Sequence, residues 1–156
     1  MDFYNTYLLE LIRTLNKFEV EYIIIGGFAT NYYGYQRATG DIDFWIKDSL
    51  SNREKMIAAF KKLEYGFFPQ LKDLPLLPGI LNIYISDGVY VDIMDRIMNF
   101  EPSDFIVCYS RAKVEVIDDT VFRFIHLNDH LQSKKNSPRL KDQLDYNELL
   151  KLNREK

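Results

Sequence analysis

Segments with apolar residues at helical spacing alternate along this chain with short β-rich apolar runs. Residues 2–18 carry apolar side chains at helical spacing and therefore predict an amphipathic helix. The run at 22–25 is short, rich in β-branched residues and followed by glycine, which favours a buried strand. A second helical pattern covers residues 51–64. Its first residues, SNRE, form a capping-box sequence that predicts a helix start at Ser51.

The middle of the chain predicts a loop and then a hairpin. Residues 65–79 contain three prolines among apolar side chains, which favours a long irregular segment. Two β-rich runs follow at 80–85 and 89–95, and Asp87-Gly88 between them predicts a hairpin turn. The large apolar side chains of the loop either cover the core or form a wall for a base or acceptor; they are Phe67, Phe68, Leu74 and Leu77.

The last third returns to a helical pattern. It predicts a short helix, two strands and a further helix, at residues 103–109, 114–116, 121–124 and 127–136. Ser137-Pro138 is a preferred pair for opening a last helix. The expected apolar stripe of that helix is Leu140, Leu144, Leu149, Leu150 and Leu152. The order of elements predicts an α/β (α+β) fold, with helices packed against a mixed β-sheet and helices at the C-terminal end.

Composition narrows the class of protein. A chain of 156 residues with 47% hydrophobic content can form one domain, expected over 1–156, with a proper core. The net charge of −3 provides no overall basic field for nucleic acid or anionic membrane, and the aromatic residues lack the basic neighbours of a single-strand nucleic-acid platform. One cysteine excludes an internal disulfide. No signal-peptide pattern and no long apolar run is present, so we expect a cytoplasmic protein without a membrane span.

Candidate chemistry concentrates at residues 26–43, of sequence GGFATNYYGYQRATGDID. Gly26 and Gly27 follow the predicted strand and open a short helix, whose free N–H groups and dipole attract an anion such as phosphate. Asp41 and Asp43 are two apart on the next strand, so both carboxylates leave one face, about 6–7 Å apart. Such oxygens bind hard cations. Alternatively, the glycines simply make a turn and the acids lie at a solvated edge.

A third carboxylate is expected in the second strand of the hairpin. Asp92 lies between Val91 and Ile93, and a carboxylate within an apolar strand is costly unless a cation or donor satisfies it. Asp95 is the alternative. It falls at the strand end, on the other face and next to Arg96, where a surface ion pair explains it better.

These residues together resemble the nucleotidyltransferase superfamily typified by DNA polymerase β. Its signature is a glycine pair, a short helix and then acid-hydrophobic-acid on the next strand; thirteen residues lie between Gly27 and Asp41 here. The fuller string adds Phe28-Ala29, Arg37 and Thr39, and looks like the small bacterial branch that includes aminoglycoside-type and toxin–antitoxin nucleotidyltransferases. Many members have a serine after the glycine, so Phe28 departs from the pattern and removes a hydroxyl contact to phosphate.

The resemblance implies transfer of a nucleoside monophosphate from a nucleoside triphosphate to an acceptor hydroxyl of a small molecule, tRNA or protein, with release of pyrophosphate. Two Mg²⁺ ions are implied on Asp41, Asp43 and Asp92, the last of which also takes the proton of the acceptor. The nucleotide-binding set that it implies is Gly26, Gly27, Arg37, Thr39, Lys134 and Arg139. The last two belong to a C-terminal string that also contains Lys141-Asp142, Asp145 and Leu149. Arg139, Asp142 and Asp145 also have the spacing of ordinary exposed ion pairs on a helix.

Two other classes of function remain open from the sequence. The first is a non-catalytic nucleotide-binding or regulatory module that keeps the fold, such as a toxin–antitoxin partner. The second is a structural interaction protein in which the acids cap turns. The resemblance also allows a protein partner or a homo-oligomer.

Overall fold

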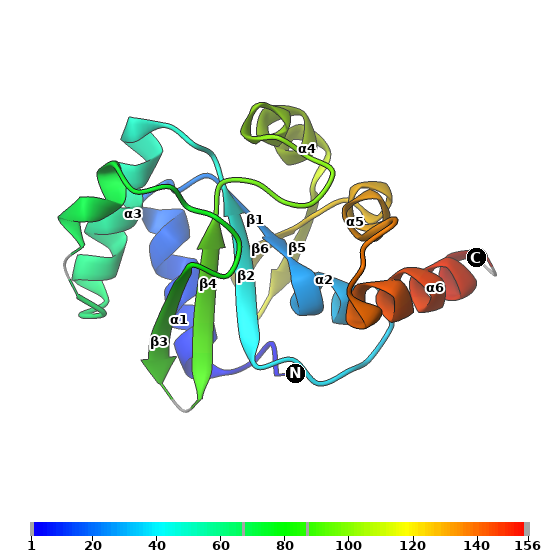
Figure 1. Ribbon diagram of the computed structural model, residues 1–156. Coiled ribbons are helices and arrows are strands. Elements are labelled where there is room, and N and C mark those ends of the chain that lie inside the picture. The colour runs from blue at the N-terminus through cyan, green and yellow to red at the C-terminus, as the bar shows by residue number, and fades with distance from the viewer. Residues whose placement is uncertain (1, 67, 87, 155–156) are drawn as a thin grey trace.

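The computed structural model describes residues 2–66, 68–86 and 88–154, and within them it is a mixed α/β fold (Figure 1). The predicted fold class is therefore confirmed. Phe67 and Asp87, which the sequence assigned to the loop and the hairpin turn, lie outside the described residues. The helices are α1 (Thr6–Lys17), α2 (Gly26–Tyr32), α3 (Leu50–Lys62), α4 (Phe105–Arg111), α5 (Leu127–Lys134) and α6 (Leu140–Arg154). The strands are β1 (Tyr22–Ile25), β2 (Asp41–Ile46), β3 (Leu81–Ser86), β4 (Val89–Met94), β5 (Lys113–Ile117) and β6 (Thr120–Phe124).

The strands form one mixed sheet in the order β3-β4-β2-β1-β6-β5. Strand β2 is antiparallel to β1 and parallel to β4, while β3/β4 and β5/β6 are antiparallel pairs. The start of β2 therefore lies between the end of β1 and the middle of β4. Ile25 pairs with Asp43, and Asp43 pairs with Asp92.

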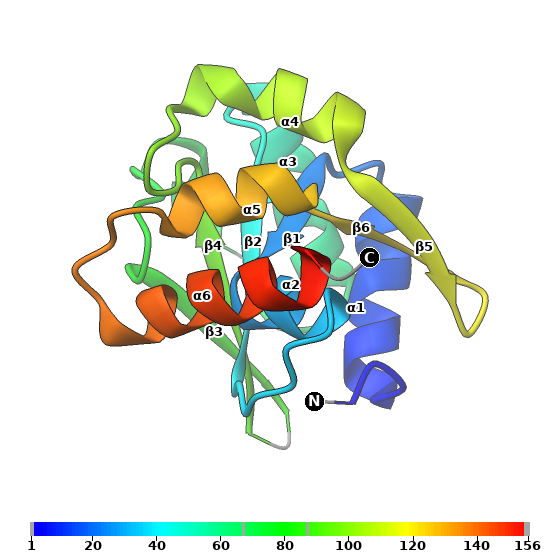
Figure 2. The same ribbon diagram turned by 90° about the vertical axis from the view of Figure 1, so that its right-hand side faces the viewer.

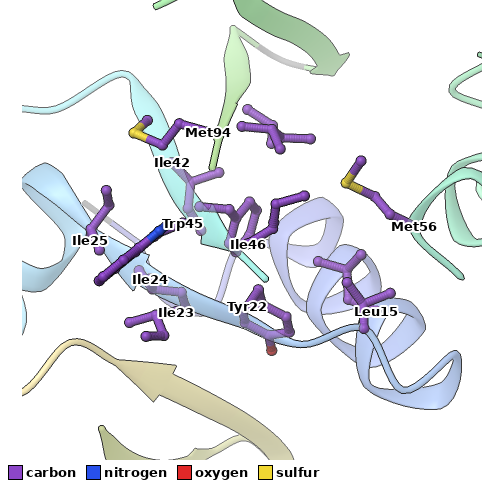
Figure 3. Close-up of a cluster of buried hydrophobic side chains, with 14 of the residues drawn as sticks. Leu15, Tyr22, Ile23, Ile24, Ile25, Ile42, Trp45, Ile46, Met56 and Met94 are labelled. Atoms are coloured by element: carbon purple, nitrogen blue, oxygen red, sulfur yellow. The ribbon is translucent and has the colours of Figure 1, made fainter. Parts of the chain in front are cut away.

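Helices cover both faces of the central strands. Figures 1 and 2 show α1 and α3 against one face, with α4, α5 and α6 on the other. Side chains of β1 and β2 gather with Leu15 of α1 and Met56 of α3 in the buried cluster of Figure 3. Trp45 is fully buried, and its indole Nε1 donates to the backbone oxygen of Asp95 at 2.9 Å. Burial on both faces holds β2 in a fixed position at the centre of the molecule.

The start of α3 differs from the prediction. The N-cap is Ser49, whose hydroxyl accepts from the N–H of Asn52 at 3.2 Å, so the predicted start at Ser51 is wrong. Asn52 is buried, and its side chain accepts from the N–H of Glu21 and donates to the backbone oxygen of Lys47. These two bonds join α3 to the segments that flank β1 and β2. They form with Asn52 inside the first turn of the helix, so the helix begins before the predicted position.

The apolar stripe expected for α6 is also largely wrong. Of the five leucines, Leu149 is buried, whereas Leu140, Leu144 and Leu152 are exposed. The other buried residue of α6 is Asp145. Helix α6 therefore packs on the domain through a narrow contact that includes a carboxylate. No helix among the described residues has the length and apolar character that crossing a bilayer requires.

The loop at 65–79 packs more specifically than the sequence suggested. Phe68 does pack against the core, but Leu74 and Leu77 are exposed, and the buried leucines are Leu71 and Leu76. A short 3₁₀ helix, Pro69–Lys72, interrupts the loop. Arg53 of α3 donates to the backbone oxygens of Leu71 and Leu74. The N–H of Asp95 donates to the backbone oxygen of Leu76 at 2.7 Å. These bonds fix the loop to α3 and to the end of β4.

We expect Arg53→Met to be strongly destabilising. Arg53 is 6% exposed and also contacts the carboxylates of Asp48 and Asp95, so its loss leaves buried acceptors without their donor. The expected decrease in the free energy of unfolding is about 3–5 kcal/mol, measured by urea denaturation. The exposed Lys62→Met on the same helix serves as the control and should change it by less than about 0.5 kcal/mol. If Arg53→Met lowered the free energy of unfolding by less than about 1 kcal/mol, the claim that Arg53 fixes the loop to α3 would be contradicted.

Candidate active site

Three carboxylates leave one face of the sheet on neighbouring strands. Asp41 and Asp43 are the first and third residues of β2, and the parallel register places Asp92 of β4 directly beside Asp43. Residues paired in register point to the same face, so the acids lie side by side at this end of the sheet.

Asp95 lies elsewhere. It follows β4 on the opposite face, where it approaches Arg53 of α3 and accepts from Arg96 Nε at 2.8 Å. The expected ion pair with Arg96 is therefore present, but its acid is buried at 2% exposure while the Arg96 side chain is 42% exposed. Asp95 is a structural acid that takes no part in this group.

A cleft of about 820 Å³ lies over the three carboxylates. The cleft brings together segments from the whole chain: the end of β1, the start of β2, β4, and the α5–α6 connection. All the site residues predicted from the sequence line it, namely Gly26, Gly27, Arg37, Thr39, Asp41, Asp43, Asp92, Lys134 and Arg139. Their placement together is an observation, and their roles remain predictions.

The pKa of Asp43 records the crowding of negative charge. Burial raises it, the charges of Asp92 and Asp41 raise it further, and the result is a pKa of about 6 against an ordinary 3.8. The charges of Lys134 and Lys141 act in the opposite direction. At neutral pH the folded protein therefore holds an ionised carboxylate at a position that disfavours the charge.

Asp92 is only partly satisfied. Its Oδ2 accepts from the N–H of Gly79 at 3.0 Å, and its Oδ1 is buried without a hydrogen-bond partner among the described residues. Burial raises the pKa of Asp92, and the Gly79 bond opposes that rise. An unpartnered buried carboxylate oxygen beside other carboxylates is a position that a cation would satisfy.

The donor set fits a hard cation that takes few protein ligands. Among the described residues, no three His, Cys, Asp or Glu side chains are arranged to hold one metal ion together. Mg²⁺ commonly binds through one or two carboxylates and completes its shell with water and substrate phosphates. Asp41, Asp43 and Asp92 suit such an ion better than one that needs a complete protein cage.

The two glycines are required by close packing at the start of α2. Gly26 has a φ of +61°, and a Cβ there would lie 1.8 Å from Asp43 Oδ2. A Cβ on Gly27 would lie 2.4 Å from Thr39 Oγ1. The glycine pair thus allows the helix to begin against Asp43 and Thr39, and no side chain caps this helix start.

The opposite wall of the cleft is basic, but its cations are already paired. Arg37 donates from Nε to Asp145 at 2.7 Å, and Lys134 Nζ lies 2.8 Å from Asp145 and 3.0 Å from Asp142. Arg139 is 72% exposed and lies 3.9 Å from Asp142. The expectation of exposed ion pairs on this helix therefore holds for Arg139 and is wrong for Asp145, which is fully buried.

Two contributors to the site did not emerge from the sequence. Gly79 supplies a backbone N–H to Asp92, and no local pattern marks it. Lys141 lines the cleft and lowers the pKa of Asp43. Its one signal was its position beside Asp142 in the C-terminal string.

Comparison with known proteins gives one family. The family model described as "Nucleotidyl transferase of unknown function (DUF2204)" matches residues 4–156. No curated protein matches the chain.

The raised pKa of Asp43 predicts the sign of a stability change. A carboxyl with a folded pKa of about 6 destabilises the fold when ionised, and this penalty disappears as the pH falls from about 6 towards 4. Without metal, Asp43→Asn should therefore melt above the parent at pH 7–8, by about 2–4 °C for each kcal/mol relieved. The difference should vanish near pH 4. Thermal unfolding in chelator across this range measures it.

The control is Asp119→Asn, which removes an exposed charge at the β5–β6 turn and should show no such trend. An Asp43→Asn protein that is less stable than the parent at every pH would instead indicate a hydrogen-bonding or capping aspartate.

Proposed function

The chain belongs to a family of nucleotidyl transferases of unknown function, and on that premise we propose that it transfers a nucleoside monophosphate from a nucleoside triphosphate to an acceptor hydroxyl. Two Mg²⁺ ions are the proposed cofactor, with Asp41, Asp43 and Asp92 shared between them as ligands. The cleft between the strands and the α5–α6 connection is the proposed substrate site.

One observation carries this proposal: the carboxylates of the cleft lack the partners that a structural role requires. Asp92 Oδ1 is buried with no hydrogen-bond partner in the part of the chain that the structure describes, and the pKa of Asp43 is raised to about 6. The neighbouring cations relieve this only in part: the charges of Lys134 and Lys141 lower the pKa of Asp43, but its pKa stays at about 6. Arg37 and Lys134 form their ion pairs with Asp145 and Asp142 instead. Unrelieved negative charge at a cleft is typical of a site for an external cation.

Each side of the cleft has a distinct proposed task. The oxygens of the triphosphate bind at the start of α2, at Gly26 and Gly27, and along the basic wall of Arg37, Lys134 and Arg139. The acceptor approaches over β4, because Asp92 lies on the side of Asp43 away from the glycines. The register of the strands thus separates donor from acceptor.

In the transfer step, the acceptor oxygen forms a bond to the α-phosphorus. The bond from that phosphorus to the oxygen bridging to the β-phosphate breaks, and pyrophosphate leaves with the electron pair. Asp92 takes the proton of the hydroxyl as general base. Arg37 and Lys134 face the charge that develops on pyrophosphate. Bound Mg²⁺ would supply neutralisation of the triphosphate charge and a lower pKa for the acceptor hydroxyl.

The first test concerns coupled binding. A triphosphate brings negative charge to a site that already holds three carboxylates, so it should bind well only together with Mg²⁺. The melting temperature of the protein should rise more with both ligands than the sum of the shifts with each alone. Equal shifts with and without metal would contradict a joint site.

The second test concerns transfer. Asp92→Asn removes the base and a cation ligand while keeping the shape of the side chain, and should reduce transfer at least about a hundredfold. The measurement is incorporation of label from each α-labelled nucleoside triphosphate into acceptors of a cell extract, with Asp119→Asn as the control of normal activity. Coupled binding without transfer by the parent protein would support the non-catalytic module instead.

A further inference from the structure

One buried carboxylate holds two of the cations that line the cleft, Arg37 and Lys134. Asp145 of α6 is 0% exposed. Its Oδ1 accepts from Arg37 Nε at 2.7 Å, and its Oδ2 accepts from Arg37 Nη2 at 2.8 Å. Lys134 Nζ lies 2.8 Å from the same Oδ2. The two cations come from the β1–β2 connection and from α5, so three separate segments meet at this carboxylate.

Further contacts tie the same group to the glycine turn. The hydroxyl oxygen of Thr30 in α2 lies 3.2 Å from Asp145 Oδ2 and 3.1 Å from the backbone oxygen of Gly26. The ring of His130 lies 2.9 Å from this hydroxyl. Burial lowers the pKa of His130 to about 3, so the ring is neutral and adds no charge to the network.

Asp145 is ionised in this setting. Burial alone would raise its pKa, but the hydrogen bonds and charges of Arg37 and Lys134 outweigh burial and lower it. The two-point contact fixes the plane of the guanidinium, which a single contact would leave free to rotate.

Donors remain available to a ligand after these contacts are made. A guanidinium has five N–H groups, of which Arg37 uses two on Asp145 and one on the backbone oxygen of Ala38. An ammonium has three, of which Lys134 uses one each on Asp142 and Asp145. Both side chains line the cleft, so their remaining N–H groups can serve phosphate oxygens without breaking the contacts to Asp145.

We propose that Asp145 is a positioning residue for the triphosphate, because it holds the cations that bind the phosphates. Through Asp145, the packing of α6 on the domain and the binding of phosphate are linked, so that each one favours the other. This inference rests on the proposed function of the cleft. The buried residues of α6 are Asp145 and Leu149, so the carboxylate that orients the cations is also one of the groups that anchor the helix. When α6 is undocked, Arg37 and Lys134 lose their fixed positions. By reciprocity, phosphate bound to them stabilises the docked helix.

The test variant is Asp145→Asn, which keeps the shape of the side chain but places an N–H₂ group against the donors of Arg37 or Lys134. The probe is magnesium tripolyphosphate, which carries the phosphate chemistry without a nucleoside, measured by calorimetry. Its dissociation constant should rise at least about tenfold. If transfer is detected, KM for the triphosphate should rise by a similar factor while kcat changes less.

The chain offers a matched control in Asp129→Asn. Asp129 is another buried aspartate, held by Nε and Nη2 of Arg111, and neither residue is among those that line the cleft. Its loss should lower stability without changing the affinity for magnesium tripolyphosphate. Equal weakening by the two variants, or unchanged affinity in Asp145→Asn, would overturn the positioning role.

A second measurement applies even if Asp145→Asn does not fold. In the parent protein, magnesium tripolyphosphate should slow amide hydrogen exchange in residues 140–154, and unchanged exchange in that helix would overturn the linkage. Arg37→Lys keeps the charge but loses the two-point contact, and should also bind the probe more weakly. A parent that binds the probe through Asp145 yet transfers no nucleotide would overturn the proposed reaction and leave this inference standing. A parent that does not bind the probe would overturn both.

Discussion

The carboxylates of Asp41, Asp43 and Asp92 repel one another on one face of β2 and β4, and the surrounding structure holds them together against this repulsion. The parallel pairing of these strands sets Asp43 beside Asp92, and the glycine at 26 lets the start of α2 approach Asp43 with no Cβ between them. Burial raises the pKa of Asp43, and the charges of Asp92 and Asp41 raise it further, to about 6. Hydrophobic burial on both faces of the central strands keeps the acids together, because any shift of β2 would expose Ile42, Phe44 and Trp45.

The other buried acids show the opposite solution. Asp95, Asp129 and Asp145 each lie against an arginine, and such pairs satisfy a carboxylate inside the fold. Among the residues that the structure describes, Asp43 and Asp92 form no such ion pair, and both line the cleft, where the charges of Lys134 and Lys141 only partly offset the raised pKa of Asp43. The contrast within one chain separates acids that hold the structure together from acids that are available to a ligand.

The walls of the cleft are held by elements that are remote in sequence. On one side, Arg53 fixes the loop at 65–79, from which Gly79 reaches Asp92. On the other, Asp145 fixes Arg37 and Lys134. Each wall thus depends on a buried charged residue that lies behind it. A substitution at either one would alter the cleft without touching any group that lines the carboxylate face.

The sequence by itself determined the fold class, the common face of Asp41 and Asp43, and the unusual position of Asp92 in an apolar strand. Those features follow from local spacing, since the alternation along a strand decides which side chains leave the same face. The tertiary structure decided the start of α3 at Ser49, the exposure of the α6 leucines, the burial of Asp145 and the hydrogen bond from Gly79. Spacing sets the direction of a side chain, but the partner it meets depends on which distant segments pack beside it. Asp145 has the spacing of a surface ion pair, and it became the centre of a buried network because Arg37 and Lys134 converge on it from two other elements.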